Sequence, residues 1–203
     1  MSANLTITIP NWLDRIFAWP VLIYRKYKYG YTFRRIYLGQ GLFTKVDPED
    51  YYRFNSFNWC PKEDGQNIYA VRLAGNPKKR VNVITLHREI MNNPVGLIVD
   101  HRNNYGLDNR RDNLRHATHG QNMYNRKKTK RKTSSKYVGV CFNKRLRRWA
   151  VTINYSRNRK FLGYFDNEAD AARAYDRAAI KYHADFARLN FSREDYVNEI
   201  RPS

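Results

Sequence analysis

The amino-acid sequence predicts an α+β fold in which short antiparallel strands predominate. Apolar and polar side chains alternate over residues 33–38, 42–46 and 149–154, which is the period of a half-buried strand. An alanine-rich stripe at residues 171–182 repeats every three or four positions, which is the period of a helix packed on one face. Apolar residues make up 42% and aromatic residues 15% of the chain, enough to form a hydrophobic core.

The N-terminal part of the chain predicts an extension followed by a β-rich region. Residues 1–32 are unassigned, apart from a short helix expected at residues 11–24 and broken at Pro20. Strands at 33–38 and 42–46 flank a Gly-Gln-Gly turn. Asp47 and Pro48 predict the start of a short helix, because proline and acidic residues are favoured in the first turn. Strands at 68–73 and 81–86 complete the β-rich region, residues 33–86.

Residues 87–125 predict a loop-dominated site, because they are rich in His, Asn and Arg and have little apolar periodicity. A short helix at residues 88–92 is expected within them, and we interpret His87 as the structural residue that opens it. Residues 126–136 form a basic linker without apolar residues.

The C-terminal part, residues 137–192, predicts a three-stranded antiparallel sheet packed on one helix. Trp149, Val151 and Ile153 share one face of a strand, and a second strand is expected at residues 159–164. Asp166 is expected to cap a helix at residues 167–183, whose small alanines let it lie close to the sheet. Residues 193–203 are a tail.

Charge is the most unusual feature of the composition. The chain has 38 Lys and Arg against 18 Asp and Glu, a formal net charge of +20 at pH 7. Residues 113–165 contain no acidic residue and 15 Lys or Arg. Such a stretch indicates contact with a phosphate backbone, although a basic surface that only improves solubility remains the alternative.

The composition also excludes several classes of protein. Two cysteines are too few for a disulfide framework or a Cys-rich zinc site. The longest apolar run, residues 16–24, is too short to span a bilayer, and the N-terminus lacks the pattern of a signal peptide. We therefore expect a cytoplasmic protein that binds nucleic acid and has no membrane partner.

Residues that suit phosphodiester hydrolysis occur at the end of a predicted strand. Asp100 supplies a hard oxygen suited to Mg²⁺, and the adjacent His101 supplies a base that titrates near neutrality. Asn122 offers a second oxygen. Hydrolysis needs a base that activates water and a cation that stabilises the developing charge. The sequence thus predicts a one-cation hydrolytic site.

The chain resembles the homing-type HNH endonucleases of phages and bacteria in five segments: His87-Arg88, Val99-Asp100-His101, Leu107-Asp108-Asn109-Arg110, Asn113-Leu114-Arg115 and Thr118-x-x-x-Asn122. The resemblance implies a ββα-metal nuclease unit over residues 87–125. His101 would be the general base and Asn113 would brace the catalytic loop. Asp100 and Asn122 would bind one divalent cation, Mg²⁺, for which Mn²⁺ can substitute. Many relatives carry histidine where this chain has Asn122, and His119 is out of register by three positions.

A second resemblance covers about residues 134–192. They are similar to the Apetala-2/ethylene-response-factor DNA-binding domain in these segments: Ser135-Lys136-Tyr137-Val138-Gly139-Val140, Trp149, Leu162-Gly163-Tyr164-Phe165, residues 171–179 and Ala187-Arg188-Leu189-Asn190-Phe191. The resemblance implies that the sheet, and not the helix, enters the major groove. Plant members carry arginines on the first strand where this chain has Val138, Cys141 and Asn143, so their target sequence cannot be transferred.

The predicted DNA contacts fall into two groups. The side chains expected to face the bases are Asn143, Thr152, Asn154, Arg159 and Phe161. Cations in turns and in the linker are expected to contact phosphates: Arg145, Arg147, Arg157, Lys127, Lys128 and Arg131.

Together, the two resemblances predict a metal-dependent homing-type endonuclease that hydrolyses phosphodiester bonds in double-stranded DNA. We expect a monomer, encoded by a phage or a bacterium. One alternative is a sequence-specific DNA-binding regulator with an inactive HNH unit. Another is a protein that binds or cuts structured RNA, although the shallow minor groove of RNA does not suit a sheet that reads a major groove.

Overall fold

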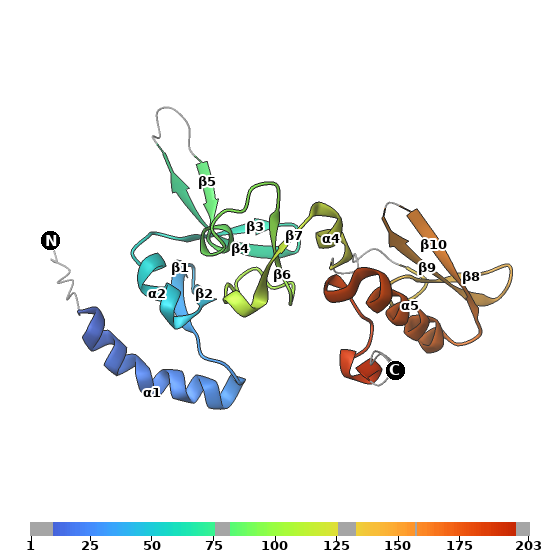
Figure 1. Cartoon of the computed structure of the whole chain (residues 1–203), viewed down its shortest axis with the longest axis horizontal. Coiled ribbons are helices and arrows are strands. Elements are labelled where there is room, and N and C mark those ends of the chain that lie inside the picture. Colours follow the sequence, from blue (N-terminus) through green and yellow to red (C-terminus); the bar gives the residue numbers. More distant parts are fainter. Residues whose placement is uncertain (1–9, 76–81, 126–132, 157, 198–203) are drawn as a thin grey trace. The chain divides into compact units, whose positions relative to one another are not determined.

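The chain divides into two compact units in the computed structural model (Figure 1). Unit 1 comprises Met1–Val95 and Val99–His116, and unit 2 comprises Gly96–Ile98 and Ala117–Ser203. The structure describes residues 10–75, 82–125, 133–156 and 158–197. Each unit has its own cluster of buried apolar side chains. Among the helices in these ranges, none is long and apolar enough to cross a membrane.

Unit 1 begins with a long helix and a hairpin. Helix α1 (Asn11–Tyr29) is followed by β1 (Arg34–Gly39) and β2 (Leu42–Val46), which pair antiparallel. Gln40 has φ 54° between Gly39 and Gly41, which also have positive φ, so the turn needs residues that tolerate the left-handed region. Helix α2 (Pro48–Phe54) then starts as predicted, with Asp47 at the N-cap and proline at the first position.

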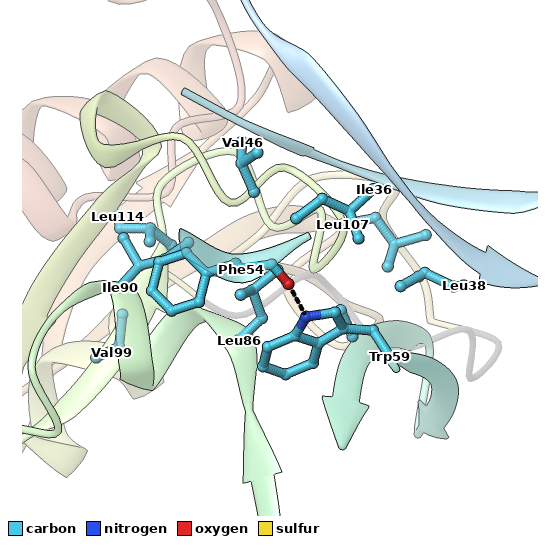
Figure 2. Packing of buried hydrophobic residues seen from close by; sticks show 11 residues of the cluster. Ile36, Leu38, Val46, Phe54, Trp59, Leu86, Ile90, Val99, Leu107 and Leu114 are labelled. Carbon is cyan, nitrogen blue, oxygen red and sulfur yellow. Dashed lines mark hydrogen bonds between the residues drawn. The ribbon is translucent and has the colours of Figure 1, made fainter. Parts of the chain in front are cut away.

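A second sheet and a short helix complete the core of unit 1. Strands β3 (Cys60–Asp64), β4 (Asn67–Ala74) and β5 (Asn82–Thr85) form an antiparallel sheet in the order β3-β4-β5, and α3 (Leu86–Ile90) follows. Figure 2 shows side chains from β1, β2, α2 and α3 packed into one cluster. Trp59 lies at its edge and donates a hydrogen bond from Nε1 to the carbonyl of Phe54 (2.8 Å), which satisfies the indole when it is buried.

The central segments of the HNH resemblance, residues 99–101, 107–110 and 113–115, lie on two paired strands and on the loop between them. Strand β6 (Ile98–His101) pairs with β7 (Leu114–Ala117), and the short 3₁₀ helix η1 (Arg111–Asn113) precedes β7. The loop docks on β2, where the amide of Lys45 donates to Leu107 and the amide of Asn109 donates to Lys45 (both 2.8 Å). The β1–β2 hairpin therefore fixes the position of Asp108 and Asn109.

Unit 2 has the sheet and helix that the sequence predicts. After α4 (His119–Tyr124) come β8 (Val140–Asn143), β9 (Arg148–Tyr155), β10 (Asn158–Phe165) and α5 (Glu168–His183), and the 3₁₀ helices η2 (Ala184–Phe186) and η3 (Arg193–Tyr196) follow. The sheet is antiparallel in the order β10-β9-β8. Val151 and Ile153 pack against Ala171, Ala172 and Tyr175 of α5. The α+β class is thus confirmed, with antiparallel sheets in both units.

Three local predictions were wrong. Helix α1 continues through Pro20 to Tyr29, and because the side chains around Pro20 are exposed, water can reach the carbonyl left without its helical donor. Strand β3 was missed because its sequence, CPKED, carries a proline and three charges; it is an edge strand, where these residues are tolerated. The N-cap of α5 is Asn167, whose Oδ1 accepts from the amide of Ala169 (2.7 Å), and not Asp166.

Candidate nucleic-acid interface

The sheet of unit 2 has one face covered by α5 and one exposed face, which we call the outer face. Along β9 the buried Val151 and Ile153 alternate with Thr152 and Asn154, which lie on the outer face. Phe161 of β10 pairs directly with Thr152, and Arg159 pairs with Asn154. Since residues directly opposite each other share a face, these four side chains form two adjacent rows on the outer face. This is the placement that the alternation predicts.

Contacts between and along the strands hold these side chains in place. Nη2 of Arg159 donates to Oγ1 of Thr152 (3.1 Å), and the ring centroids of Phe161 and Tyr164 are 4.9 Å apart in an edge-to-face arrangement. Asn143 differs from the rest, because its Oδ1 accepts from the amide of Leu146 (3.0 Å) and closes the turn after β8. Its side-chain oxygen therefore stabilises a turn, whereas we had expected it to face bases.

Cations lie around the rim of the outer face. Arg145 and Arg147 are exposed in the turn between β8 and β9. Arg147 takes a φ of 52°, so the backbone of this tight turn is in the left-handed region. Arg148 is held by Asp166, with 2.7 Å between Nε and Oδ1. Four of the predicted phosphate contacts lie outside the described residues: Lys127, Lys128, Arg131 and Arg157.

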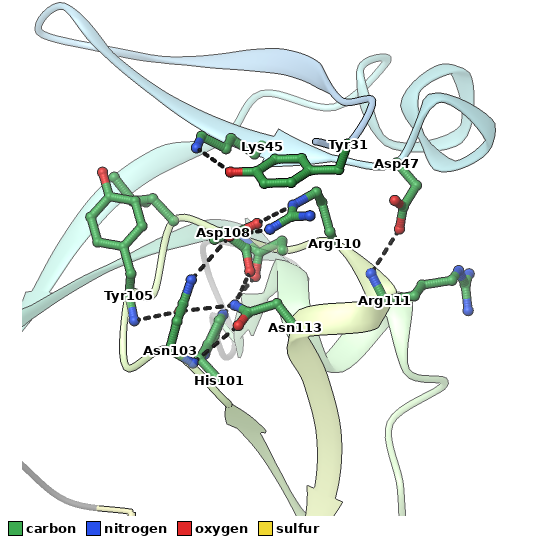
Figure 3. Close-up of polar contacts among 12 residues, drawn as sticks. Tyr31, Lys45, Asp47, His101, Asn103, Tyr105, Asp108, Arg110, Arg111 and Asn113 are labelled. Carbon is green, nitrogen blue, oxygen red and sulfur yellow. Dashed lines mark hydrogen bonds and ion pairs between the residues drawn. The ribbon is translucent and has the colours of Figure 1, made fainter. Parts of the chain in front are cut away.

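The HNH-like residues of unit 1 form a polar network that braces its own loop (Figure 3). Nδ2 of Asn113 donates to the carbonyl of Asp108 (2.7 Å) and to Oδ1 of Asn103 (3.0 Å), and Oδ1 of Asn113 accepts from the amide of Asn103 (3.0 Å). The carboxylate of Asp108 binds Arg110 (2.8 Å), whose guanidinium carbon lies 3.4 Å from the ring centroid of Tyr31. The side chain of Asn113 therefore serves the loop geometry.

His101 is buried within this network. Its Nε2 lies 2.9 Å from Oδ1 of Asn109, whose Nδ2 donates to Oγ1 of Thr44 (2.7 Å). Burial lowers the pKa of His101. Burial also lowers the pKa of His87 to about 3, helped by the nearby His101 and Arg88, and the rings of His87 and His101 lie 5.0 Å apart. Both rings are therefore neutral at pH 7, and we had expected His101 to titrate near neutrality.

Asp100 has a guanidinium as its cationic partner. Its Oδ2 accepts from Nη2 (2.6 Å) and Nε (2.8 Å) of Arg115 on the neighbouring strand β7, and both side chains are buried. Asn122, the other expected metal ligand, belongs to α4 in unit 2, as does His119. Within the described ranges, no group of three or more His, Cys, Asp or Glu could hold a metal ion. The ion pair of Asp100 gives no support to a ββα-metal centre, and the predicted metal ligands and Mg²⁺ remain untested.

One contact at the end of β9 was not anticipated. The ring of Tyr124 in α4 stacks on His183 at the end of α5, with centroids 3.8 Å apart and planes 3° from parallel. Nε2 of His183 lies 2.7 Å from the carbonyl of Asn154, and the hydroxyl of Tyr124 accepts from the amide of Ser156 (3.3 Å). The contact thus supports the end of β9, beside a pocket of about 410 Å³. Because its parts are far apart in sequence, periodicity gives no signal for it.

Comparison with known proteins finds relatives that match part of this chain. The chain is 44% identical to APETALA2-like protein 2 of rice over 78 residues, which are 37% of this chain and 18% of the relative. It is 42% identical over 71 residues to the AP2-like ethylene-responsive transcription factor TOE2 of Arabidopsis, covering 35% of this chain and 15% of the relative. Over these residues the chain is similar to APETALA2-like proteins. No family model matches the chain.

The relatives overturn the prediction that the protein is an enzyme. They are named APETALA2-like proteins or ethylene-responsive transcription factors, and not nucleases. They come from rice and Arabidopsis, and give no support to a phage or bacterial origin. The chain spans less than a fifth of the length of these relatives, with 15–18% covered.

Proposed function

We propose that this chain is a sequence-specific DNA-binding regulator that reads duplex DNA with the outer face of the β8–β9–β10 sheet. The observation that carries the proposal is the pair of rows formed by Thr152 with Phe161 and Asn154 with Arg159, on the face opposite α5. The similarity to APETALA2-like proteins supports it. In this proposal the signature residues of unit 1 hold the fold of that unit.

The chemistry of the outer face suits the edges of base pairs. A narrow β-ribbon fits the major groove of B-DNA. There, an asparagine amide pairs well with adenine, a guanidinium pairs with guanine, and apolar groups contact the methyl of thymine. Asn154, Arg159 and Phe161 offer these three functions on adjacent strands. The exposed Arg145 and Arg147 lie at the rim, where a cation meets phosphate and adds affinity without sequence information.

The proposal predicts that base-facing and phosphate-facing residues have different effects. A preferred duplex is first selected from a random library with the full chain. Fluorescence anisotropy then measures affinity for this duplex and for a shuffled one over a range of salt. Asn154→Ala should weaken binding to the selected duplex by about 1–3 kcal/mol and leave binding to the shuffled duplex unchanged. Arg145→Ala should weaken both equally and lower the slope of log affinity against log salt by about 1.

A matched control is available on α5. Arg173 is exposed on this helix, away from the outer face, so Arg173→Ala removes the same charge and should change neither the discrimination nor the salt slope. Equal binding of the selected and shuffled duplexes by the unmodified chain would contradict the proposal. So would tighter binding to a double-stranded RNA competitor, which would favour an RNA partner.

A further inference from the structure

Helix α1 presents an apolar face that is largely exposed among the described residues of unit 1. Trp12, Ile16, Trp19, Ile23 and Tyr27 recur every three or four positions, and at about 100° per residue they share one side of the helix. Their exposed fractions range from 51% for Ile23 to 90% for Tyr27. All of α1 lies within the described residues, and none of its residues is buried. An exposed apolar stripe of this length marks an interaction surface.

The opposite side of α1 attaches the helix to the rest of unit 1. The carboxylate of Asp14 accepts hydrogen bonds from Nη2 of Arg34 (2.9 Å) and from the hydroxyl of Tyr52 (2.8 Å). The guanidinium of Arg25 donates to the carbonyl of Phe33 and lies 4.4 Å from its ring centroid. Because the polar side holds the helix to its own protein, the apolar side is directed outward.

Cations lie close to the apolar and aromatic side chains of α1. Lys26 follows Trp19 by seven positions, two helical turns, and is exposed beside it. Lys28 lies beside two other exposed rings of α1, with Nζ 5.6 Å from the ring centroid of Tyr24 and 5.5 Å from that of Tyr29. The hydrogen bond with Tyr24 raises the pKa of Lys28. Such side chains can keep their charge in water while their stems lie along an apolar surface.

The charge and shape of α1 indicate which kind of partner could cover its apolar face. A second copy would bring the same cations together on a chain whose net charge is already +20, so charge opposes self-association. The face is the convex side of one helix, which can sink into a soft surface without a matching groove. Trp, Tyr and Ile on one side with Lys and Arg at the borders is the pattern of helices that lie in the headgroup layer of a membrane.

We propose that α1 lies flat in the surface of a bilayer containing anionic phospholipid, with Trp12, Ile16, Trp19 and Ile23 directed toward the acyl chains. The sequence had led us to expect no membrane partner, because residues 16–24 are too short to span a bilayer. Lying on a surface requires an amphipathic face and not a spanning length. The proposal concerns unit 1 and does not depend on DNA binding by unit 2.

Acyl-chain quenching of tryptophan fluorescence tests the proposal on the full chain. The vesicles contain phosphatidylcholine brominated on its acyl chains, with or without phosphatidylglycerol. Of the four tryptophans, Trp12 and Trp19 lie on α1, whereas Trp59 and Trp149 lie in the two folded cores. We expect quenching and a blue shift with the anionic vesicles only. The double variant Trp12→Phe/Trp19→Phe should still sediment with these vesicles but lose the quenching.

A second variant tests the apolar face itself. Ile16→Ser/Ile23→Ser should weaken vesicle binding at least about tenfold, because it removes two apolar side chains from the face that enters the acyl chains. Leu73→Ser/Val83→Ser removes two exposed apolar side chains from β4 and β5 and should leave binding unchanged. Vesicle binding without quenching would show that only the basic sheet attaches, and would overturn the proposal. A dimer in light scattering that Ile16→Ser/Ile23→Ser dissociates, again without quenching, would instead identify self-association.

Discussion

Gly139 shows how a single residue limits the packing of the sheet on α5. Its φ is 76°, and a Cβ added there would overlap the ring of Tyr175 and lie 2.9 Å from the carbonyl oxygen of Thr152. Gly139→Ala combines an unfavourable backbone conformation with overpacking, and should destabilise unit 2 by about 2–4 kcal/mol. Amide hydrogen exchange of β9 in the intact chain measures this loss within unit 2.

Gly120 provides the matched glycine in the same unit. It lies in α4 with nothing nearer to an added Cβ than Oγ1 of Thr118 at 3.9 Å. Gly120→Ala should leave β9 unchanged, and should stabilise α4 itself by up to about 1 kcal/mol. If the two alanine variants exchanged alike, the proposed crowding at Tyr175 would be wrong.

His87 makes the stability of unit 1 depend on pH. Burial lowers its pKa to about 3, and Nδ1 has no hydrogen-bond partner among the described residues. The unfolded chain binds a proton near the usual pKa of about 6.5. The contribution of neutral His87 is therefore complete above that pH and is lost as the pH falls toward 3. Between about pH 4 and pH 6 it should amount to about 1.4 kcal/mol per pH unit.

Urea unfolding followed by Trp59, which is buried in unit 1, measures this slope. His87→Leu should reduce the slope of the unfolding free energy against pH by the amount that one titrating proton contributes. Part of the slope should persist, because burial also lowers the pKa of His101. His119→Leu changes an exposed histidine of unit 2 and should not alter the slope. An unchanged slope in His87→Leu would mean that the ring is protonated in the folded protein.

Among the secondary-structure elements, the sequence predicts those features that neighbouring residues determine. The turn at Gly39–Gly41, the start of α2 at Pro48 and the alternation along β9 each depend on neighbouring residues, and all three were predicted correctly. The extent of α1 and the edge strand β3 were not, because tolerance of proline and charge depends on exposure to solvent, which a single sequence does not show.

In the candidate sites too, features that depend on neighbouring residues could be predicted, and features that depend on distant residues could not. Thr152 and Asn154 could be placed on the outer face because period two separates the faces of a strand. The partner of Asp100 could not be predicted, because Arg115 is fifteen residues away and meets it only when β7 pairs with β6. A carboxylate that looks like a free ligand in the sequence is thus a buried ion pair, and removing either side would leave the other charge buried and uncompensated.

For the whole molecule, the net charge indicates the kind of partner but not the function. The acid-free stretch of residues 113–165 carries 15 cations and crosses the boundary between the units at residues 116 and 117. Its field attracts any polyanion and adds affinity that depends strongly on salt. It does not distinguish a regulator from a nuclease. The names of the relatives support the proposed regulator, and the ion pair between Asp100 and Arg115 agrees with that proposal.

The whole chain should accordingly bind plasmid DNA without cutting it. Supercoiled plasmid incubated with the protein and Mg²⁺ should stay supercoiled after protease and detergent remove the bound protein, and should match the EDTA control on an agarose gel. The physical reason is that Asp100 is held by Arg115 and that the buried Nε2 of His101 is engaged with Oδ1 of Asn109 (2.9 Å), so neither side chain is set up to bind a metal or activate water at this site. His101→Ala is the matched variant and should give the same gel. If the unmodified chain nicked the plasmid, and this nicking disappeared both in the variant and in EDTA, the proposal of a regulator would be wrong. Asp100 would then have to exchange its guanidinium partner for a metal ion.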